Sequence, residues 1–423
     1  MNLVNKNRID LVIGILYAEF YLKNYNTTFH KDLYLEHKRV WNGLKEKHFH
    51  GEKAFINRFN SLIESINKEK KNLETVEVWN INNYLWVRDG FHRISILHYL
   101  NLQPNINIVN RIETDIYKYG VSHMCPTNIY FFKQRGLNQM YCDFIMKTYL
   151  IKHVKNFSCI VIFPNDVPIP NLIDKESIIY EKQITNYTKE FSYNLIQILY
   201  YDEKWCFDGG FLRKAPRCFN NFGKPLRILF TKKYDSATLI QIKSKLRQIY
   251  NKGKDSVHTP DTQEENNYLL MLLNHNTFNL MNKQNTLYNN FKNFKRLLQR
   301  LKIFCSENRI DTDYICITSS AVLSIYNIRD CADLDLFVDK KYETIFATSE
   351  FDNHNSHTIK NYYPLHFEDI IHNPNNHFLF LNFKVCKLDI IYRYKKYRIT
   401  NNLYSKSSTL KDINDVKNIE KFL

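Results

Sequence analysis

Three aspartates in the C-terminal third of the chain have the spacing of a metal site. Asp333 and Asp335 stand two residues apart beside and within the apolar run Leu334–Val338, and side chains two apart on a strand point to the same face. Asp389 lies in a second β-prone run, Val385–Tyr392. Carboxylate oxygens are the ligands that Mg²⁺ and Mn²⁺ prefer. The spacing therefore predicts a Mg²⁺ or Mn²⁺ site for metal-assisted phosphoryl chemistry.

A strand, a turn of small residues and a helix precede this pair of acids. The run Tyr314–Ile317 is apolar and β-prone, Ser319 and Ser320 interrupt it, and a helical pattern of apolar residues follows. Because only one helix and a short loop join the runs Tyr314–Ile317 and Leu334–Val338, we expect them to be neighbouring strands of one mixed sheet.

The order of these features resembles the nucleotidyltransferase superfamily, the fold of DNA polymerase beta and of minimal nucleotidyltransferases. The family pattern is an apolar residue, Gly, then Gly or Ser, followed by Asp-apolar-Asp and by a third acid on a later strand. Ser319-Ser320, Asp333-Leu334-Asp335 and Asp389 match it in order, over about residues 290 to 423. Two further matches are Tyr326-Asn327-Ile328-Arg329 and the tail Leu410-Lys411-Asp412-Ile413-Asn414-Asp415-Val416.

The resemblance implies transfer of a nucleoside monophosphate from a nucleoside triphosphate to an unknown hydroxyl acceptor. Asp333 and Asp335 would hold the metal, and Asp389 would be a third ligand or would activate the attacking hydroxyl. Ser319, Ser320 and Arg329 would contact the nucleotide. Basic residues after the third acid would neutralise developing charge, namely Arg393, Lys395, Lys396 and Arg398.

One residue departs from the family pattern. Ser319 replaces the first Gly, which lets the backbone approach the phosphates without a Cβ in the way. This departure favours the alternative function, a nucleotide- or nucleic-acid-binding scaffold that retains the fold without turnover.

A second motif, Asp89-Gly90-Phe91-His92-Arg93, lies between a β-prone run and a helical pattern. A glycine turn that leads into a helix presents free N–H groups to phosphate, and His92 and Arg93 would add donors. The motif resembles the Asp-Gly-x-His-Arg of the ParB/sulfiredoxin fold, over about residues 70 to 115. The resemblance implies nucleotide binding at Gly90, His92 and Arg93. Phe91 stands where sulfiredoxins carry a catalytic Cys, which leaves a kinase, a nuclease or a structural corner open.

The polar loop from Lys254 to Asp261 has two interpretations. Lys254, Ser256, His258 and Asp261 are the residue types of a phosphate or acyl-transfer site. They lack the full Gly-x-x-x-x-Gly-Lys-Ser spacing, and Thr262 begins a capping box, so a loop that leads into a helix is the preferred interpretation.

The chain is long and basic. Its 423 residues suffice for two or three domains, and its net charge of +16 favours nucleoside triphosphates or nucleic acid as partners. Nine Cys residues form no Cys-x-x-Cys pair, which argues for a reducing compartment and against a zinc ribbon. The sequence has neither a signal peptide nor an apolar run of about 18 residues. It therefore predicts a cytoplasmic protein with no membrane partner.

Together the motifs predict a multidomain α+β protein. Residues 1–115 would be a helical lead-in with a ParB/sulfiredoxin-like domain, 116–285 a middle α/β domain of unknown role, and 286–423 a nucleotidyltransferase-like domain with a mixed sheet and flanking helices.

Overall fold

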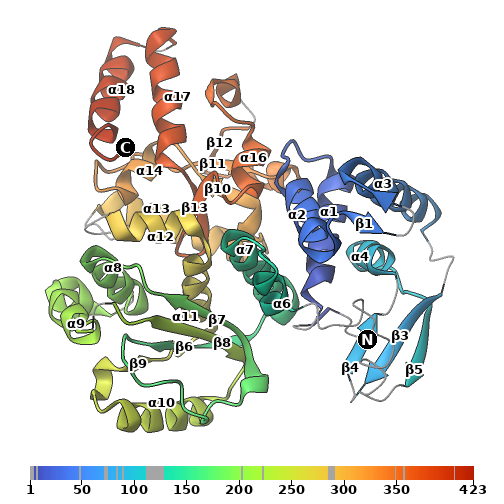
Figure 1. Cartoon of the computed structure of the whole chain (residues 1–423). Coiled ribbons are helices and arrows are strands. Elements are labelled where there is room, and N and C mark those ends of the chain that lie inside the picture. Colours follow the sequence, from blue (N-terminus) through green and yellow to red (C-terminus); the bar gives the residue numbers. More distant parts are fainter. Residues whose placement is uncertain are drawn as a thin grey trace. The chain divides into compact units, whose positions relative to one another are not determined.

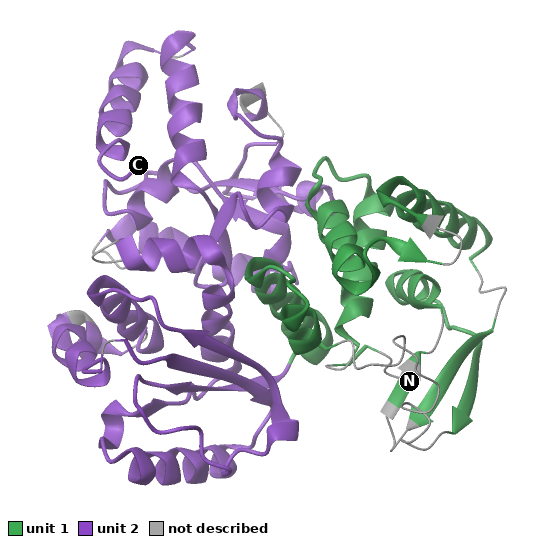
Figure 2. Cartoon of the chain, viewed as in Figure 1, with its two compact units in different colours: residues 1–155 green, residues 156–423 purple. Residues whose placement is uncertain are grey.

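The chain is an α+β protein with two compact units, Met1–Lys155 and Asn156–Leu423 (Figures 1 and 2). The expected α+β class is thus confirmed. The computed structural model describes all residues except 1–3, 6–7, 47–48, 71–74, 82–83, 88–89, 111–127, 202, 222, 284–290, 348, 356–357 and 404.

Helix α1, Ile9–Lys23, is the centre of the first unit. All its residues from Ile9 to Glu19 are buried, because it is apolar on every side rather than along one stripe. Four helices pack against it: α2 (Phe29–Asn42), α3 (Glu52–Glu69), α4 (Phe91–Tyr99) and α7 (Gln139–Tyr149). The smaller elements are α6 (Ile129–Gln134) and the hairpin of β1 (Lys45–Glu46) and β2 (Phe49–His50).

A three-stranded sheet completes the first unit. Strand β3, Val76–Ile81, lies between β4, Tyr84–Val87, and β5, Ile106–Asn110. It pairs antiparallel with β4 and parallel with β5. Helix α4 follows β4 in the chain, so the strand-to-helix corner expected at Gly90 is present.

The second unit begins with an antiparallel sheet of order β7-β8-β6-β9. Helix α10, Ser236–Tyr250, covers it with Leu246 packed on Leu229 and Val257. The strands are β6 (Phe157–Ile162), β7 (Ile178–Ile184), β8 (Leu226–Lys232) and β9 (Val257–His258). The other helices are α8 (Lys189–Leu199), α9 (Phe211–Cys218), α11 (Gln263–Tyr268) and α12 (His275–Lys283). The capping box predicted at Thr262 begins α11.

A mixed sheet of order β12-β11-β10-β14-β13 forms the C-terminal part of this unit. Its central strand β10 is covered on both faces, because Ile315, Cys316 and Ile317 are all buried although their side chains alternate between the faces. The strands are β10 (Ile315–Ile317), β11 (Asp335–Val338), β12 (Asp352–Asn353), β13 (His377–Phe380) and β14 (Phe383–Cys386). The helices are α13 (Lys292–Glu307), α14 (Ser320–Ile325), α15 (Glu343–Phe346), α16 (Phe367–His372), α17 (Leu388–Thr400) and α18 (Lys406–Ile419).

A polar side chain joins helix α12 to the edge strand β13 of the C-terminal sheet. Thr277, on α12, donates its hydroxyl to the backbone O of Leu379 at 3.3 Å and accepts from the Leu379 N–H at 2.7 Å. These bonds satisfy an otherwise open edge of β13, so α12 anchors the C-terminal sheet to the middle part of the unit.

The two strands expected to be neighbours are neighbours. β10 pairs antiparallel with β11, with Ile317 opposite Leu336. The assignment of Val385–Tyr392 as a strand is wrong, because β14 ends at Cys386 and α17 begins at Leu388. The buried residues of α17 include Leu388, Ile391 and Tyr394, a spacing of three residues that follows the helical repeat.

The domain boundaries expected after residues 115 and 285 fall within the undescribed stretches 111–127 and 284–290. They stay predictions. None of the helices in the described part of the chain has the length and apolar character needed to cross a bilayer.

Candidate metal centre in the C-terminal sheet

The turn between β10 and α14 is the first part of the site. Ser319 occupies it with φ 54° and ψ −130°, a conformation that costs a residue with a Cβ about 1–3 kcal/mol. Its hydroxyl donates a hydrogen bond to the carboxylate of Asp335. The backbone N–H of Thr318 donates to the Asp335 backbone O at 2.9 Å. The turn is therefore held directly against the first residue of β11.

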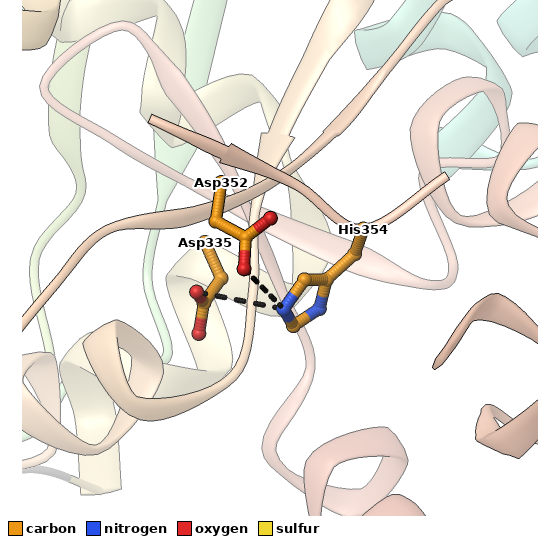
Figure 3. A group of neighbouring side chains, drawn as sticks. All are labelled: Asp335, Asp352 and His354. Carbon is orange, nitrogen blue, oxygen red and sulfur yellow. Dashed lines mark ion pairs between the residues drawn. The ribbon is translucent and has the colours of Figure 1, made fainter. Parts of the chain in front are cut away.

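Two carboxylates and an imidazole meet at the start of β11 (Figure 3). β12 pairs in parallel with β11, and the register sets Asp352 beside Asp335. The Nε2 atom of His354 lies 3.4 Å from Asp335 Oδ1 and 3.9 Å from Asp352 Oδ2. The three donor atoms lie within 4.8 Å of one another. One cation could contact all three side chains.

A buried tyrosine orients the His354 ring. Nδ1 of His354 lies 3.2 Å from the Tyr363 hydroxyl, and that hydroxyl accepts from Thr318 Oγ1 at 3.0 Å. The Tyr363 ring stacks on Tyr394 with ring centroids 4.1 Å apart. Because Nδ1 is occupied by this contact, Nε2 is the nitrogen directed at the carboxylates, an arrangement typical of metal-binding histidines.

The carboxylates at the site differ in their electrostatics. Burial opposes ionisation of Asp335, but the hydrogen bonds of His354 and Ser319 outweigh it, so the Asp335 pKa is lowered. Asp333 is exposed and precedes β11. Its pKa is raised, first by partial burial and then by the charge of Asp335. A cation would relieve this repulsion. The carboxylate of Asp335 is therefore readily ionised, and a second carboxylate, that of Asp333, lies near enough for the two charges to repel each other.

The donor set fits a divalent cation. Carboxylate oxygens suit Mg²⁺, Ca²⁺ and Mn²⁺, whereas an imidazole nitrogen suits transition metals. Two carboxylates with one imidazole therefore favour Mn²⁺ over Mg²⁺ if His354 is a ligand.

Asp389 is not one of the three residues of this group. Asp389 lies in the first turn of α17, where it pairs with Arg393 at 3.1 Å and with Lys387 at 3.6 Å. It adjoins the end of β14, the strand next to β10. Of the three predicted acids, Asp335 belongs to the group that could hold a metal, and Asp333 interacts with Asp335 through charge. A role for Asp389 at the site stays a prediction.

Other predicted nucleotide contacts are engaged in an ion cluster that joins the tail helices. Nε and Nη2 of Arg329 donate to both carboxylate oxygens of Asp415, at 2.6 and 2.8 Å. Lys395 is buried, with Nζ 2.8 Å from Asp412 and from Asp415, and Arg398 lies 3.1 Å from Asp412. We call these five residues the tail ion cluster. The two aspartates of the tail pattern Lys-Asp-apolar-x-Asp, Asp412 and Asp415, therefore hold α18 against α17 by these ion pairs.

The corner at Gly90 belongs to the first unit. Gly90 has φ 91°, and a Cβ there would lie 3.2 Å from the Val76 side chain and 3.6 Å from Arg93 Nη1. Glycine is thus required by both backbone conformation and space. Asp89 is outside the described residues.

One ring nitrogen of His92 is engaged within the first unit. Its Nε2 lies 2.7 Å from the Tyr34 hydroxyl, and its ring packs 4.5 Å from Phe59. Burial, followed by the charge of Lys38, holds the His92 pKa well below its usual value. A neutral imidazole packed among aromatic rings stabilises the structure of this corner. Phosphate binding by Gly90, His92 and Arg93 stays a prediction.

Sequence reasoning missed Asp352 and His354. A signal was present, because Asp352-Asn353-His354 repeats the two-residue spacing of Asp333 and Asp335. Only the parallel pairing of β12 with β11, however, brings the two segments together.

The Ser319 turn can be tested by a pair of substitutions. Ser319→Ala keeps the strained Cβ and loses the hydroxyl, whereas Ser319→Gly also removes the strain. We expect the glycine variant to be more stable than the alanine variant by about 1 kcal/mol. Urea unfolding of both variants measures the difference.

Ser324, inside α14, is the matched control for this pair. There the alanine variant should be the more stable one, by about 1 kcal/mol. The same order at both positions would contradict a strained turn at Ser319.

Comparison of the chain with protein families, with curated proteins and with solved structures found no significant match.

Proposed function

We propose that the C-terminal part of the chain is a metal-dependent nucleotidyltransferase. The observation that carries the proposal is the group of Asp335, Asp352 and His354 directly beside the Ser319 turn. The family resemblance expects a carboxylate on the strand that follows the strand-to-helix turn, and Asp335, the first residue of β11, has this position.

A divalent cation at this group would neutralise triphosphate charge and lower the pKa of an attacking hydroxyl. Asp335 and Asp352 would hold it, and His354 would either coordinate it or position Asp335. Asp333, whose pKa is raised, is a candidate for accepting the proton of the attacking hydroxyl. It is exposed to solvent and therefore accessible to an acceptor.

Lys395 is the member of the tail ion cluster whose positive charge acts on Asp335. This lysine contributes to lowering the Asp335 pKa, after the hydrogen bonds of His354 and Ser319. We assign Arg329, Lys395 and Arg398 a structural role, because their charged groups are paired with Asp412 and Asp415.

Pyrophosphate release tests the proposal. The full chain is incubated with each ribonucleoside triphosphate, a mixed pool of hydroxyl acceptors and Mg²⁺ or Mn²⁺. We expect metal-dependent release of pyrophosphate and a labelled product when the nucleoside triphosphate is labelled in its α-phosphate. Release that is equal in wild type and Asp335→Asn would contradict the proposal.

The strained Ser319 favours a second candidate, a scaffold that binds nucleotide without turnover. In that case metal and nucleoside triphosphate together would raise the melting temperature, and no pyrophosphate would be released.

His354 decides the metal preference. Replacing it by Gln removes the nitrogen ligand and leaves both carboxylates. We expect His354→Gln to weaken Mn²⁺ binding by about 10–100-fold and Mg²⁺ binding much less. Calorimetric titration with each metal measures both. An equal loss for the two metals would indicate that His354 only orients Asp335.

A further inference from the structure

A cavity of about 750 Å³ lies in the middle part of the second unit. It is lined by the segment that follows α8, by α9 and α10, and by the loop from Lys254 to Glu265. Its volume is within the range of pockets that bind small molecules. The lining contains no residue of the candidate metal centre.

Part of the polar loop singled out in the sequence lines this cavity. Lys254, His258 and Asp261 are in its wall. Ser256 is not, and its hydroxyl donates to the backbone O of Gly253 at 2.7 Å. This arrangement favours an anion-binding role for the loop over an acyl-transfer site with Ser256 as nucleophile.

The wall of the cavity carries five cationic side chains: Lys214, Arg217, Lys243, Arg247 and Lys254. Asp255 forms ion pairs with two of them: its Oδ1 lies 2.6 Å from Lys214 Nζ, and its Oδ2 lies 3.4 Å from Arg217 Nε. Among the acids of the wall, Glu265 is occupied, because it accepts from the backbone N–H groups of Asp261 and Thr262.

Lys243 and Arg247 lie one turn apart on α10, and no carboxylate of the described residues forms an ion pair within 4.0 Å with either. Arg247 Nη2 makes only a long bond of 3.4 Å to the Val257 backbone O, and its buried Nε has no hydrogen-bond partner among the described residues. An anion between these two side chains would satisfy both.

The pKa of His258 is affected by positive charges of the cavity wall. Burial lowers its pKa to about 3, and the charges of Lys243, Lys214 and Arg247 act in the same direction. Burial also lowers the pKa of Lys243, with Arg247 adding to the effect against the opposing charges of Asp261 and Glu265. Lys214, Lys243 and Arg247 thus all act on one side chain of the wall, and an anion placed beside these three cations would be attracted to them.

Aromatic rings form another part of the wall. Trp205 lies 4.9 Å from Tyr200, and Tyr200 lies 4.9 Å from His258, between ring centroids. The Trp205 side chain is 38% exposed. Aromatic side chains beside cations are what proteins use to stack a base and hold its phosphates.

We propose that this cavity binds a nucleoside phosphate. Lys243 and Arg247 hold the phosphates by charge-assisted hydrogen bonds, and the base stacks on Trp205. The site is independent of the proposed transferase centre, and it gives the chain a nucleotide-binding site that needs no metal.

Calorimetric titration of the full chain with ATP in EDTA tests this site, because EDTA removes the metal that the transferase centre needs. We expect ATP to bind wild type and Asp335→Asn equally. The double variant Lys243→Gln, Arg247→Gln should lose affinity by at least about tenfold. Lys245→Gln, an exposed lysine on the same helix outside the cavity, should bind like wild type.

Trp205→Ala tests the base contact separately. It should weaken ATP binding and leave the binding of inorganic tripolyphosphate unchanged. Melting temperatures of the four cavity-helix and Trp205 substitutions should stay near that of wild type, because Lys243, Lys245, Arg247 and Trp205 are at least partly exposed.

Three outcomes would overturn the proposal. Equal ATP affinity in the double variant and in Lys245→Gln would exclude the cavity as the site. Loss of ATP binding in Asp335→Asn would assign the nucleotide to the transferase centre. Tripolyphosphate that binds as tightly as ATP would exclude recognition of the nucleoside.

Discussion

Asp335→Asn should remove the stabilisation of the protein by Mn²⁺ and lower pyrophosphate release by at least about a hundredfold. At a metal concentration of about 100 times Kd, Mn²⁺ should stabilise the wild type by about 2.7 kcal/mol. With affinity weakened about a hundredfold, the same concentration stabilises the variant by less than about 0.5 kcal/mol. Thermal melting with and without Mn²⁺ measures this difference.

Folding of this variant should be largely retained. Asn keeps an acceptor for the hydrogen bonds from Ser319 and His354, so the metal-free protein should lose on the order of 1 kcal/mol.

Asp339→Asn is the matched control for Asp335→Asn. Asp339 follows the opposite end of β11 and pairs with His372 at 2.9 Å. This variant should lose stability and keep its response to Mn²⁺. A normal response to Mn²⁺ in Asp335→Asn would remove Asp335 from the site.

Asp415→Ala should destabilise the protein by about 3 kcal/mol, because it leaves the partly buried Arg329 without its carboxylate and the buried Lys395 with one carboxylate, Asp412, in place of two. Asp415 is the shared acceptor of Arg329 and Lys395 in the tail ion cluster. Urea unfolding at neutral pH measures the loss. The neighbouring change Asn414→Ala, at an exposed position of the same helix, should alter stability by less than about 0.5 kcal/mol.

The loss in Asp415→Ala should depend on pH. Burial opposes ionisation of Asp415, but the hydrogen bond from Arg329 and the charge of Lys395 outweigh it and lower its pKa. A lowered folded-state pKa stabilises the protein above the unfolded-state pKa, which is about 3.9 for Asp. That stabilisation is lost as the pH falls through the folded-state pKa. The difference between wild type and variant should therefore shrink below about pH 4. A difference independent of pH would indicate lost packing instead.

The sequence patterns predicted those elements whose structure depends on residues close together in the chain. The alternation around Asp335 and the small residues at Ser319 and Ser320 identified β10, α14 and β11, because each of these elements is short and its pattern is continuous. Periodicity failed at Leu388, where apolar residues on several faces of α17 resemble a buried strand.

The remainder of the site depends on pairing between distant segments. β12 is only two residues long, and its partner is known from the hydrogen bonds with β11 rather than from its composition. Likewise, the pairing of Arg329 with Asp415 joins residues 86 positions apart. Motif matching identified both Arg329 and Asp415 but gave no sign that they pair with each other.

Diffraction from crystals of the full chain grown with Mn²⁺, recorded for the anomalous signal of manganese, tests the central claim most directly. The account predicts an anomalous peak within coordination distance of Asp335 and Asp352, with His354 Nε2 directed at it. A manganese ion bound elsewhere, with the carboxylates of Asp335 and Asp352 still bonded only to protein groups, would contradict it.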